Sequence, residues 1–139
     1  MRRFIYVFGV LACLGIIAGV FASRPTETEG LRKSTLAARV VYLMWQSGDI
    51  SQAELSAVRE PLLRLRAAIA AEPEDDLDMQ LGGYINEIID LPERATVNRL
   101  FGMIAAQDLT LAASQQRYMQ LLVLDGMIEA VVQVEQDAP

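Results

Sequence analysis

The apolar residues of this chain follow two different patterns. From Phe4 to Ala22 the sequence contains no charged residue, a length of about 19 residues that is close to the roughly 20 that a helix needs to cross a bilayer core. Beyond residue 34, apolar residues instead recur every three or four positions between polar ones. The first pattern is typical of a membrane span, and the second is typical of helices that bury one face.

The periodic part of the chain predicts five helices separated by Gly, Pro and short polar stretches. Ser51 and Glu54 form a candidate capping box at the start of the second helix. Pro61 lies inside that helix and is expected to kink it or to split it near residue 60. The expected helices cover residues 34–46, 52–71, 74–89, a segment after Pro92, and a long segment from just after Thr110 to about residue 136.

A candidate internal repeat appears at an offset of 59 residues. Met44–Ala71 aligns without gaps on Met103–Ala130, with about 8 of 28 pairs identical by our count. Both copies contain an acidic, an apolar and a hydroxyl residue in succession at the predicted turn. The pattern therefore predicts two helical hairpins joined by a connecting helix, an all-α bundle of about five helices behind the N-terminal span.

Composition agrees with a helical protein and excludes one class of partner. Apolar residues make up 53% of the chain and aromatic residues only 6%, which favours helices over a strand sandwich. The formal net charge is −6. A nucleic-acid binder needs a basic surface to displace counterions, so we expect no nucleic acid as partner.

The residue types present also limit the chemistry. Histidine is absent and Cys13 is the only cysteine, which excludes a Ser-His-Asp or Cys-His catalytic arrangement and a zinc site with such ligands. The acidic run at 72–78 lacks the spacing of a calcium loop and suits the first turn of a helix. We therefore predict a non-catalytic protein with no catalytic residues, no cofactor and no metal.

The N-terminal segment has three readings. Its length favours a retained signal-anchor helix over residues 1–23, because the apolar part of a cleaved signal peptide is usually shorter. Val20 and Ala22 nevertheless fit a cleavage site after Ala22. Cys13 could be a lipid attachment site, although the residues that follow it stay apolar. We expect the retained anchor and leave the other two open.

Small residues recur at intervals of four along this predicted span. Residues four apart share one face of a helix, and small side chains allow a partner helix to approach closely in lipid. We predict a membrane packing face of Gly9, Cys13, Gly15, Gly19 and Ser23. This face could contact another membrane protein or a second copy of the chain.

The flanking sequence predicts the orientation and the domains. Arg2 and Arg3 precede the span, which places the short N-terminus in the cytoplasm although Arg24, Arg32 and Lys33 follow it. We expect residues 24–33 to be a polar tether and residues 34–136 to be an extracytoplasmic helical bundle. The predicted location is thus the inner membrane of a bacterium, single-pass, with the bundle in the periplasm.

One set of large side chains is a candidate partner surface. These residues lie near the ends of the first and fourth helices of the bundle, where we expect most of them to fill the core between hairpins. If they are exposed instead, aromatic and Met side chains are typical of a partner-binding patch. The set comprises Tyr42, Met44, Trp45, Phe101 and Met103.

Taken together, these features predict an accessory or structural subunit, or adaptor, of a larger membrane complex, which would contact the bilayer and other membrane proteins through its span and its bundle. The alternative is an exported soluble helical binding module, such as a chaperone, an inhibitor or a pilotin-like protein, released by signal cleavage or held by lipidation. A carboxylate-dependent enzyme has the least support, because no pair of acids is marked out by the sequence.

Overall fold

The computed structural model describes residues 25–108, 110 and 114–138, with side chains described from residue 32 onward. Within these ranges the protein is all-helical, as predicted, and its extended backbone is limited to an isolated bridge between Asp76 and Gln116. The five helices are α2 (Pro25–Gln46), α3 (Gln52–Ala70), α4 (Leu81–Ile88), α5 (Glu93–Gln107) and α7 (Arg117–Asp137).

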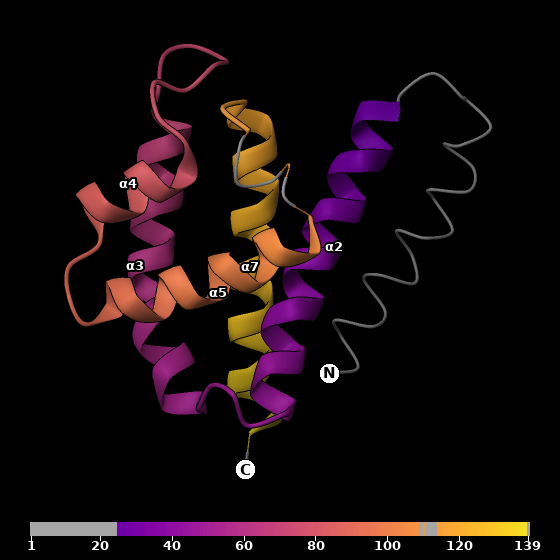
Figure 1. Ribbon diagram of the computed structural model, residues 1–139, viewed down its shortest axis with the longest axis vertical. Helices are drawn as coiled ribbons and strands as arrows, with labels where there is room; N and C mark the ends of the chain where they lie inside the picture. The colour runs from indigo at the N-terminus through magenta and orange to yellow at the C-terminus, as the bar shows by residue number, and fades with distance from the viewer. Residues whose placement is uncertain (1–24, 109, 111–113, 139) are drawn as a thin grey trace.

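Three long helices form the body of the bundle. α2 and α3 run antiparallel, and α7 packs along both of them, parallel to α2 (Figure 1). α5 crosses this layer and packs mainly on α3, with further contacts to α2 and α4. α4 lies beside the upper half of α3 (Figure 1).

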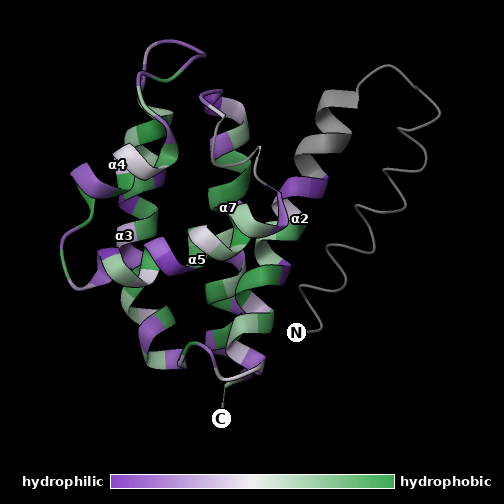
Figure 2. Ribbon diagram, viewed as in Figure 1, coloured by the Kyte–Doolittle hydropathy of each residue, from purple (hydrophilic) through white to green (hydrophobic). Residues whose placement is uncertain are grey.

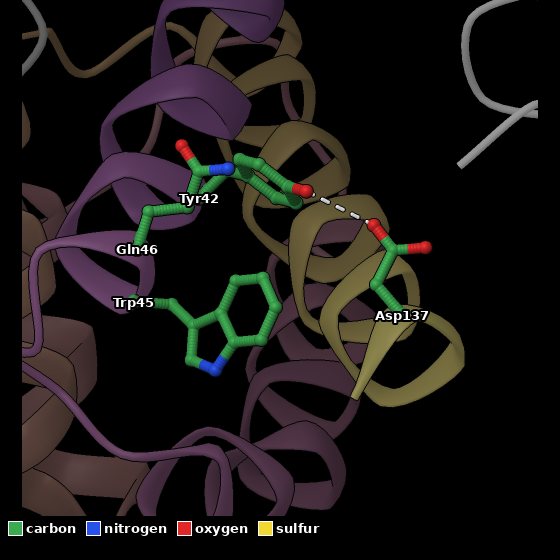
Figure 3. A pocket seen from close by; sticks show the side chains of 4 residues that line it. All are labelled: Tyr42, Trp45, Gln46 and Asp137. Atoms are coloured by element: carbon green, nitrogen blue, oxygen red, sulfur yellow. Dashed lines mark hydrogen bonds between the residues drawn. The ribbon is translucent and has the colours of Figure 1, made fainter. Parts of the chain in front are cut away.

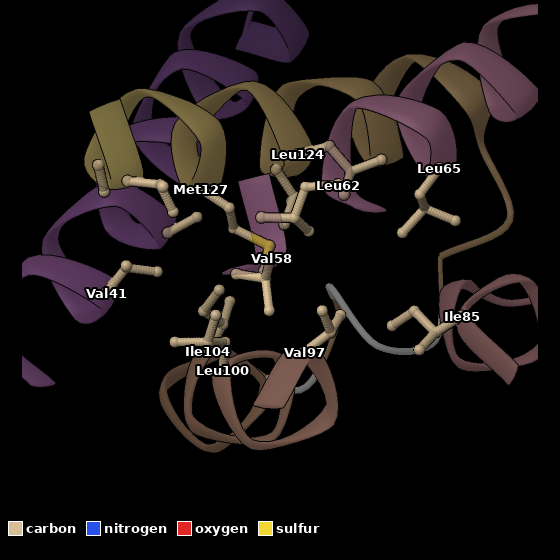
Figure 4. Close-up of a cluster of buried hydrophobic side chains, with 14 of the residues drawn as sticks. Val41, Val58, Leu62, Leu65, Ile85, Val97, Leu100, Ile104, Leu124 and Met127 are labelled. Carbon is tan, nitrogen blue, oxygen red and sulfur yellow. The ribbon is translucent and has the colours of Figure 1, made fainter. Parts of the chain in front are cut away.

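The core lies where these helices meet. In the hydropathy view, green and purple residues alternate along each helix, as expected for helices with one buried face (Figure 2). All five helices contribute buried side chains to one apolar cluster (Figure 4). Its members include Val41 from α2, Val58 and Leu62 from α3, Ile85 from α4, Leu100 and Ile104 from α5, and Leu124 and Met127 from α7.

The start of α3 confirms the predicted capping box. The Ser51 hydroxyl accepts a hydrogen bond from the Glu54 backbone N–H at 3.1 Å, and the Ser51 N–H donates to Glu54 Oε1 at 3.1 Å. Pro61 does not split the helix, which runs without interruption through this position. Its ring is buried in the core, and this packing compensates for the backbone hydrogen bond that proline cannot donate.

α2 begins earlier than the sequence pattern predicts. The helix starts at Pro25, so residues 25–33 are helical and do not form the irregular tether that Pro25 and Gly30 led us to expect. Proline suits the first helical position, and the acids at 27 and 29 are favourable near the positive end of the helix dipole. The bundle therefore includes residues that we had assigned to a linker.

The predicted helix over 74–89 is reduced to the eight residues of α4. The acidic segment before it pairs instead with the chain that precedes α7. The Leu77 N–H donates to the Gln115 carbonyl at 2.6 Å, and the Arg117 N–H donates to the Asp75 carbonyl at 2.8 Å. These long-range backbone bonds replace the helical bonds that residues 75–77 would otherwise make.

The last long helix also starts later than expected. Thr110 is helical, but residues 114–116 are not, and α7 begins at Arg117. α5 then lies across the layer of long helices instead of running alongside α7 (Figure 1). The second pair of helices is therefore a crossing and not the hairpin predicted from the internal repeat.

The close contact between α2 and α7 depends on a glycine that the sequence analysis did not single out. Gly126 lies inside α7 and is buried. A Cβ atom at this position would overlap the backbone carbonyl oxygen of Ser34 and would lie 3.0 Å from its carbonyl carbon. Backbone atoms of α2 thus occupy the space of the missing side chain, which sets the separation of the two helices.

Among the described helices, none combines the length and the apolar character required for a bilayer crossing. The predicted span over 1–23 and its packing face lie outside the described residues. The anchor, the cleavage site after Ala22 and the attachment site at Cys13 all remain predictions from the sequence.

Candidate functional site: a hollow at the ends of two helices

The clearest concave feature of the described surface is an open hollow at the lower end of the bundle. It has a volume of about 650 Å³ and is lined by Tyr42, Trp45, Gln46 and Asp137 (Figure 3). The first three residues belong to the last turns of α2, and Asp137 is the last residue of α7. Because α2 and α7 run parallel, their C-terminal ends meet here.

The two aromatic rings form one wall of the hollow. The ring centroids of Tyr42 and Trp45 are 5.4 Å apart, and the ring planes meet at 63°, an edge-to-face arrangement. The Tyr42 hydroxyl donates a hydrogen bond to Asp137 Oδ2 at 3.0 Å, across from α2 to α7 (Figure 3). One tyrosine therefore packs against the tryptophan and also fixes the carboxylate that faces it.

Asp137 is held from its own helix as well. Gln133 Nε2 donates to Asp137 Oδ1 at 2.9 Å, one helical turn earlier. Both the phenol and the amide are neutral donors, so these two bonds orient the carboxylate without cancelling its charge. The site thus presents an oriented negative charge next to aromatic rings.

The surroundings also change the acidity of Tyr42. Burial raises the pKa of the Tyr42 hydroxyl, and the hydrogen bond to Asp137 together with the negative charge of that carboxylate raises it further. The phenol therefore stays protonated throughout the physiological range and remains a hydrogen-bond donor.

The structure separates the five residues of the predicted partner surface. Tyr42 and Trp45 share the hollow and are half-buried. Met44 is buried in the core, and Phe101 is half-buried against the core from α5. Met103 is 42% exposed on α5.

Sequence reasoning missed Gln46 and Asp137. The spacing of Tyr42, Trp45 and Gln46 by three and four residues is a signal for one shared helix face and could have identified Gln46. Asp137 could not have been found in this way. Nothing in the local pattern indicates that the end of α7 lies beside the end of α2.

Other charged residues of the described chain bridge helices and loops. Asp125, an unusual acid in an apolar stretch of α7, pairs with Arg66 of α3, whereas the sequence had suggested Arg99 or Arg117. Arg117 instead binds the Glu72 carbonyl and pairs with Asp75 Oδ1 at 3.2 Å. These pairs have a structural role, because each one joins segments that are distant in the sequence.

The single lysine has a structural position too. The Lys33 side chain is 9% exposed, and its Nζ donates to Thr110 Oγ1 at 2.7 Å and lies 3.5 Å from Asp108 Oδ2. Asp108 Oδ1 also accepts from the Thr110 N–H at 3.0 Å. Hydrogen bonds from Thr110 lower the pKa of Asp108, and the positive charge of Lys33 lowers it further.

The described residues contain no group of three His, Cys, Asp or Glu side chains arranged to hold a metal ion. The acidic run at 72–78 is spread along a loop, where Tyr84 donates to Glu72 Oε1 at 3.2 Å. Comparison of the chain with protein-family models, with curated proteins and with solved structures gave no match.

Proposed function

We propose that this protein is a single-pass membrane protein whose helical bundle acts as an accessory or adaptor subunit of a larger membrane assembly. In this proposal residues 1–23 form a signal anchor in the inner membrane, with the N-terminus in the cytoplasm and the bundle outside it. The bundle then contributes a binding surface and not a catalytic one.

The observation that carries the proposal is the course of α2. This helix begins at Pro25, three residues after the uncharged segment ends at Ala22, and its middle and end pack into the core. A helix that is part of the core holds the bundle in a defined position relative to whatever anchors residues 4–22. Such a rigid connection favours a subunit that is placed against a partner.

The position of the hollow supports the same proposal. Trp45 lies 20 residues beyond Pro25, which corresponds to roughly 30 Å along a helix at about 1.5 Å per residue. The protein would therefore have two separate contact surfaces at opposite ends of α2. One is the glycine face of the span, and the other is the aromatic hollow.

Purification in a mild detergent tests the proposal. The full chain would carry an affinity tag at its N-terminus, so that only molecules that keep residues 1–23 are captured from native membranes. We expect larger proteins of defined stoichiometry to co-purify with it. Gly15→Leu with Gly19→Leu should reduce their recovery at least fivefold, because bulky residues block close helix approach.

The matched control is Ile16→Leu with Val20→Leu, which changes neighbouring positions of the span without adding bulk to the glycine face; it should leave the recovery unchanged. A protein that runs alone as a monomer would contradict the proposal. Equal loss in both double variants would contradict the glycine face. An intact mass that begins at Ser23 would replace the anchored protein with the exported soluble module.

A further inference from the structure

We infer that the hollow at the ends of α2 and α7 binds a cationic side chain, an arginine or a lysine, of the partner protein. The inference rests on the proposed adaptor function and identifies the chemistry of one of its contacts. Three independent features of the hollow favour a positive charge: its carboxylate, its aromatic rings and the two helix ends that meet there.

The carboxylate of Asp137 provides direct attraction. Its position is fixed by Tyr42 from one helix and by Gln133 from the other side, at 3.0 Å and 2.9 Å. A carboxylate has about four lone-pair positions and can accept a charge-assisted bond in addition to bonds from neutral donors. A guanidinium or ammonium group would therefore find an oriented acceptor, with no side-chain rearrangement required.

The aromatic wall adds a second attraction. The face of an aromatic ring is electron-rich and attracts a cation that lies within about 6 Å of its centre, most strongly for tryptophan. Trp45 and Tyr42 border the same open space as Asp137 (Figure 3). A planar guanidinium could stack on one of these rings while it pairs with the carboxylate.

The helix ends supply the third feature. The C-terminal end of a helix carries a partial negative charge, and a cation near it is stabilised. Proteins often meet this preference with a Lys or Arg in the last turn. Neither α2 nor α7 has a basic residue in its last turn, although both end at the hollow. A cation from outside would complement both dipoles.

The shape and the ligand set argue for a side chain and against a metal ion. Hard divalent cations take six or more oxygen ligands or several carboxylates, whereas the lining of the hollow contains one carboxylate. The hollow is also open to solvent, and its volume of about 650 Å³ can accept the end of a long side chain projecting from another protein.

Trp45 gives a direct measurement, because it is the only tryptophan in the chain. The full chain, in an uncharged detergent and at constant ionic strength, would be titrated with N-acetyl-arginine amide while tryptophan fluorescence is recorded. The neutral isostere N-acetyl-citrulline amide is the matched ligand. We expect a saturable change with the arginine compound and at least a tenfold weaker response with citrulline.

Two variants separate this site from general electrostatics. Asp137→Asn should weaken arginine binding at least tenfold. Glu87→Gln removes one charge from an exposed position on α4 and should leave binding within twofold. An equal response to arginine and citrulline, or equal effects of the two variants, would overturn the inference.

The outcomes for the two proposals can be distinguished. A failed titration with intact co-purification would remove the cation site and leave the adaptor function in place. A positive titration of a protein that purifies alone would do the reverse. Circular dichroism of each variant establishes that its helices are intact before binding is compared.

Discussion

The chain makes two turns of similar sequence that the structure builds in different ways. In the first turn, Asp49, Ile50 and Ser51 lead into α3, and in the second Asp108 and Thr110 occupy the positions 59 residues later. Ser51 caps α3 through a reciprocal bond pair with Glu54, three residues away. Thr110 bonds with Asp108 and accepts from Lys33, which is 77 residues away.

The difference shows how similar local patterns are used for different purposes. The first turn is self-sufficient, because both partners of its capping box lie within one helical turn. The second turn is fixed by an ammonium group that reaches it from α2 and is itself shielded from water. A turn of the first kind can form early and alone, whereas the second requires the tertiary fold.

The largest expected effect comes from making the second half resemble the first at one position. Ala67 in α3 is exposed, and its equivalent in α7 is the buried Gly126. Gly126→Ala should lower the free energy of unfolding by about 2–3 kcal/mol, because the added methyl group overlaps the Ser34 carbonyl. Chemical denaturation measures this change.

The control for that prediction is Gly102→Ala in α5, where a Cβ would meet no atom within 4 Å. It should stabilise the protein by about 0.5–1 kcal/mol, since alanine is the better helix former. If Gly126→Ala also stabilises the protein, α2 and α7 do not approach each other as described.

Removing the acid of the second turn should have the next largest effect. Asp108→Ala would leave the Lys33 ammonium shielded from water without its carboxylate, at a cost of about 2 kcal/mol. The equivalent change in the first turn, Asp49→Ala, removes an exposed side chain and should stay within about 0.5 kcal/mol. Equal losses for the two would mean that the turns are built alike.

The same carboxylate predicts a pH dependence. The pKa of Asp108 in the folded protein lies below its ordinary value, so the unfolded chain binds the proton more tightly. The stabilisation is therefore complete above the unfolded pKa, about 3.9, and is lost as the pH falls through the folded pKa. Urea titrations between pH 3 and pH 6 should show a smaller decline for Asp108→Asn than for the natural protein.

The cap of the first turn should contribute less. Ser51→Ala removes the acceptor of the Glu54 N–H bond and should cost about 1 kcal/mol, the usual value for an N-cap. Ser51→Thr keeps a hydroxyl and should retain most of that stability. If Ser51→Ala is neutral in thermal denaturation, the capping box does not stabilise α3.

The smallest effect is expected where the two halves touch at equivalent positions. Arg66 and Asp125 are 59 residues apart and form an ion pair between α3 and α7, with side chains 38% and 41% exposed. Solvent screens such a pair, so a double-mutant cycle with Arg66→Gln and Asp125→Asn should give a coupling below about 1 kcal/mol. High salt should reduce it further.

The sequence by itself determined the helical class, most of the helix positions and the capping box of α3. These features depend on neighbours within one or two turns, such as the three- and four-residue spacing of Leu55, Val58 and Leu62. Within the candidate site, the same spacing placed Tyr42 and Trp45 on one face. Local patterns are sufficient where the stabilising partners are local.

Only the tertiary structure decided how the helices are placed against one another. It brought Asp137 to Tyr42 across 95 residues, drew the segment before α4 out of its predicted helix, and set α5 across the bundle. Each outcome depends on a partner distant in the sequence: the end of a parallel helix, a pairing strand segment, or the backbone of Ser34 against Gly126. Periodicity records which face of a helix is buried but not what covers it, so the hollow could be located only once α2 and α7 were seen to end together.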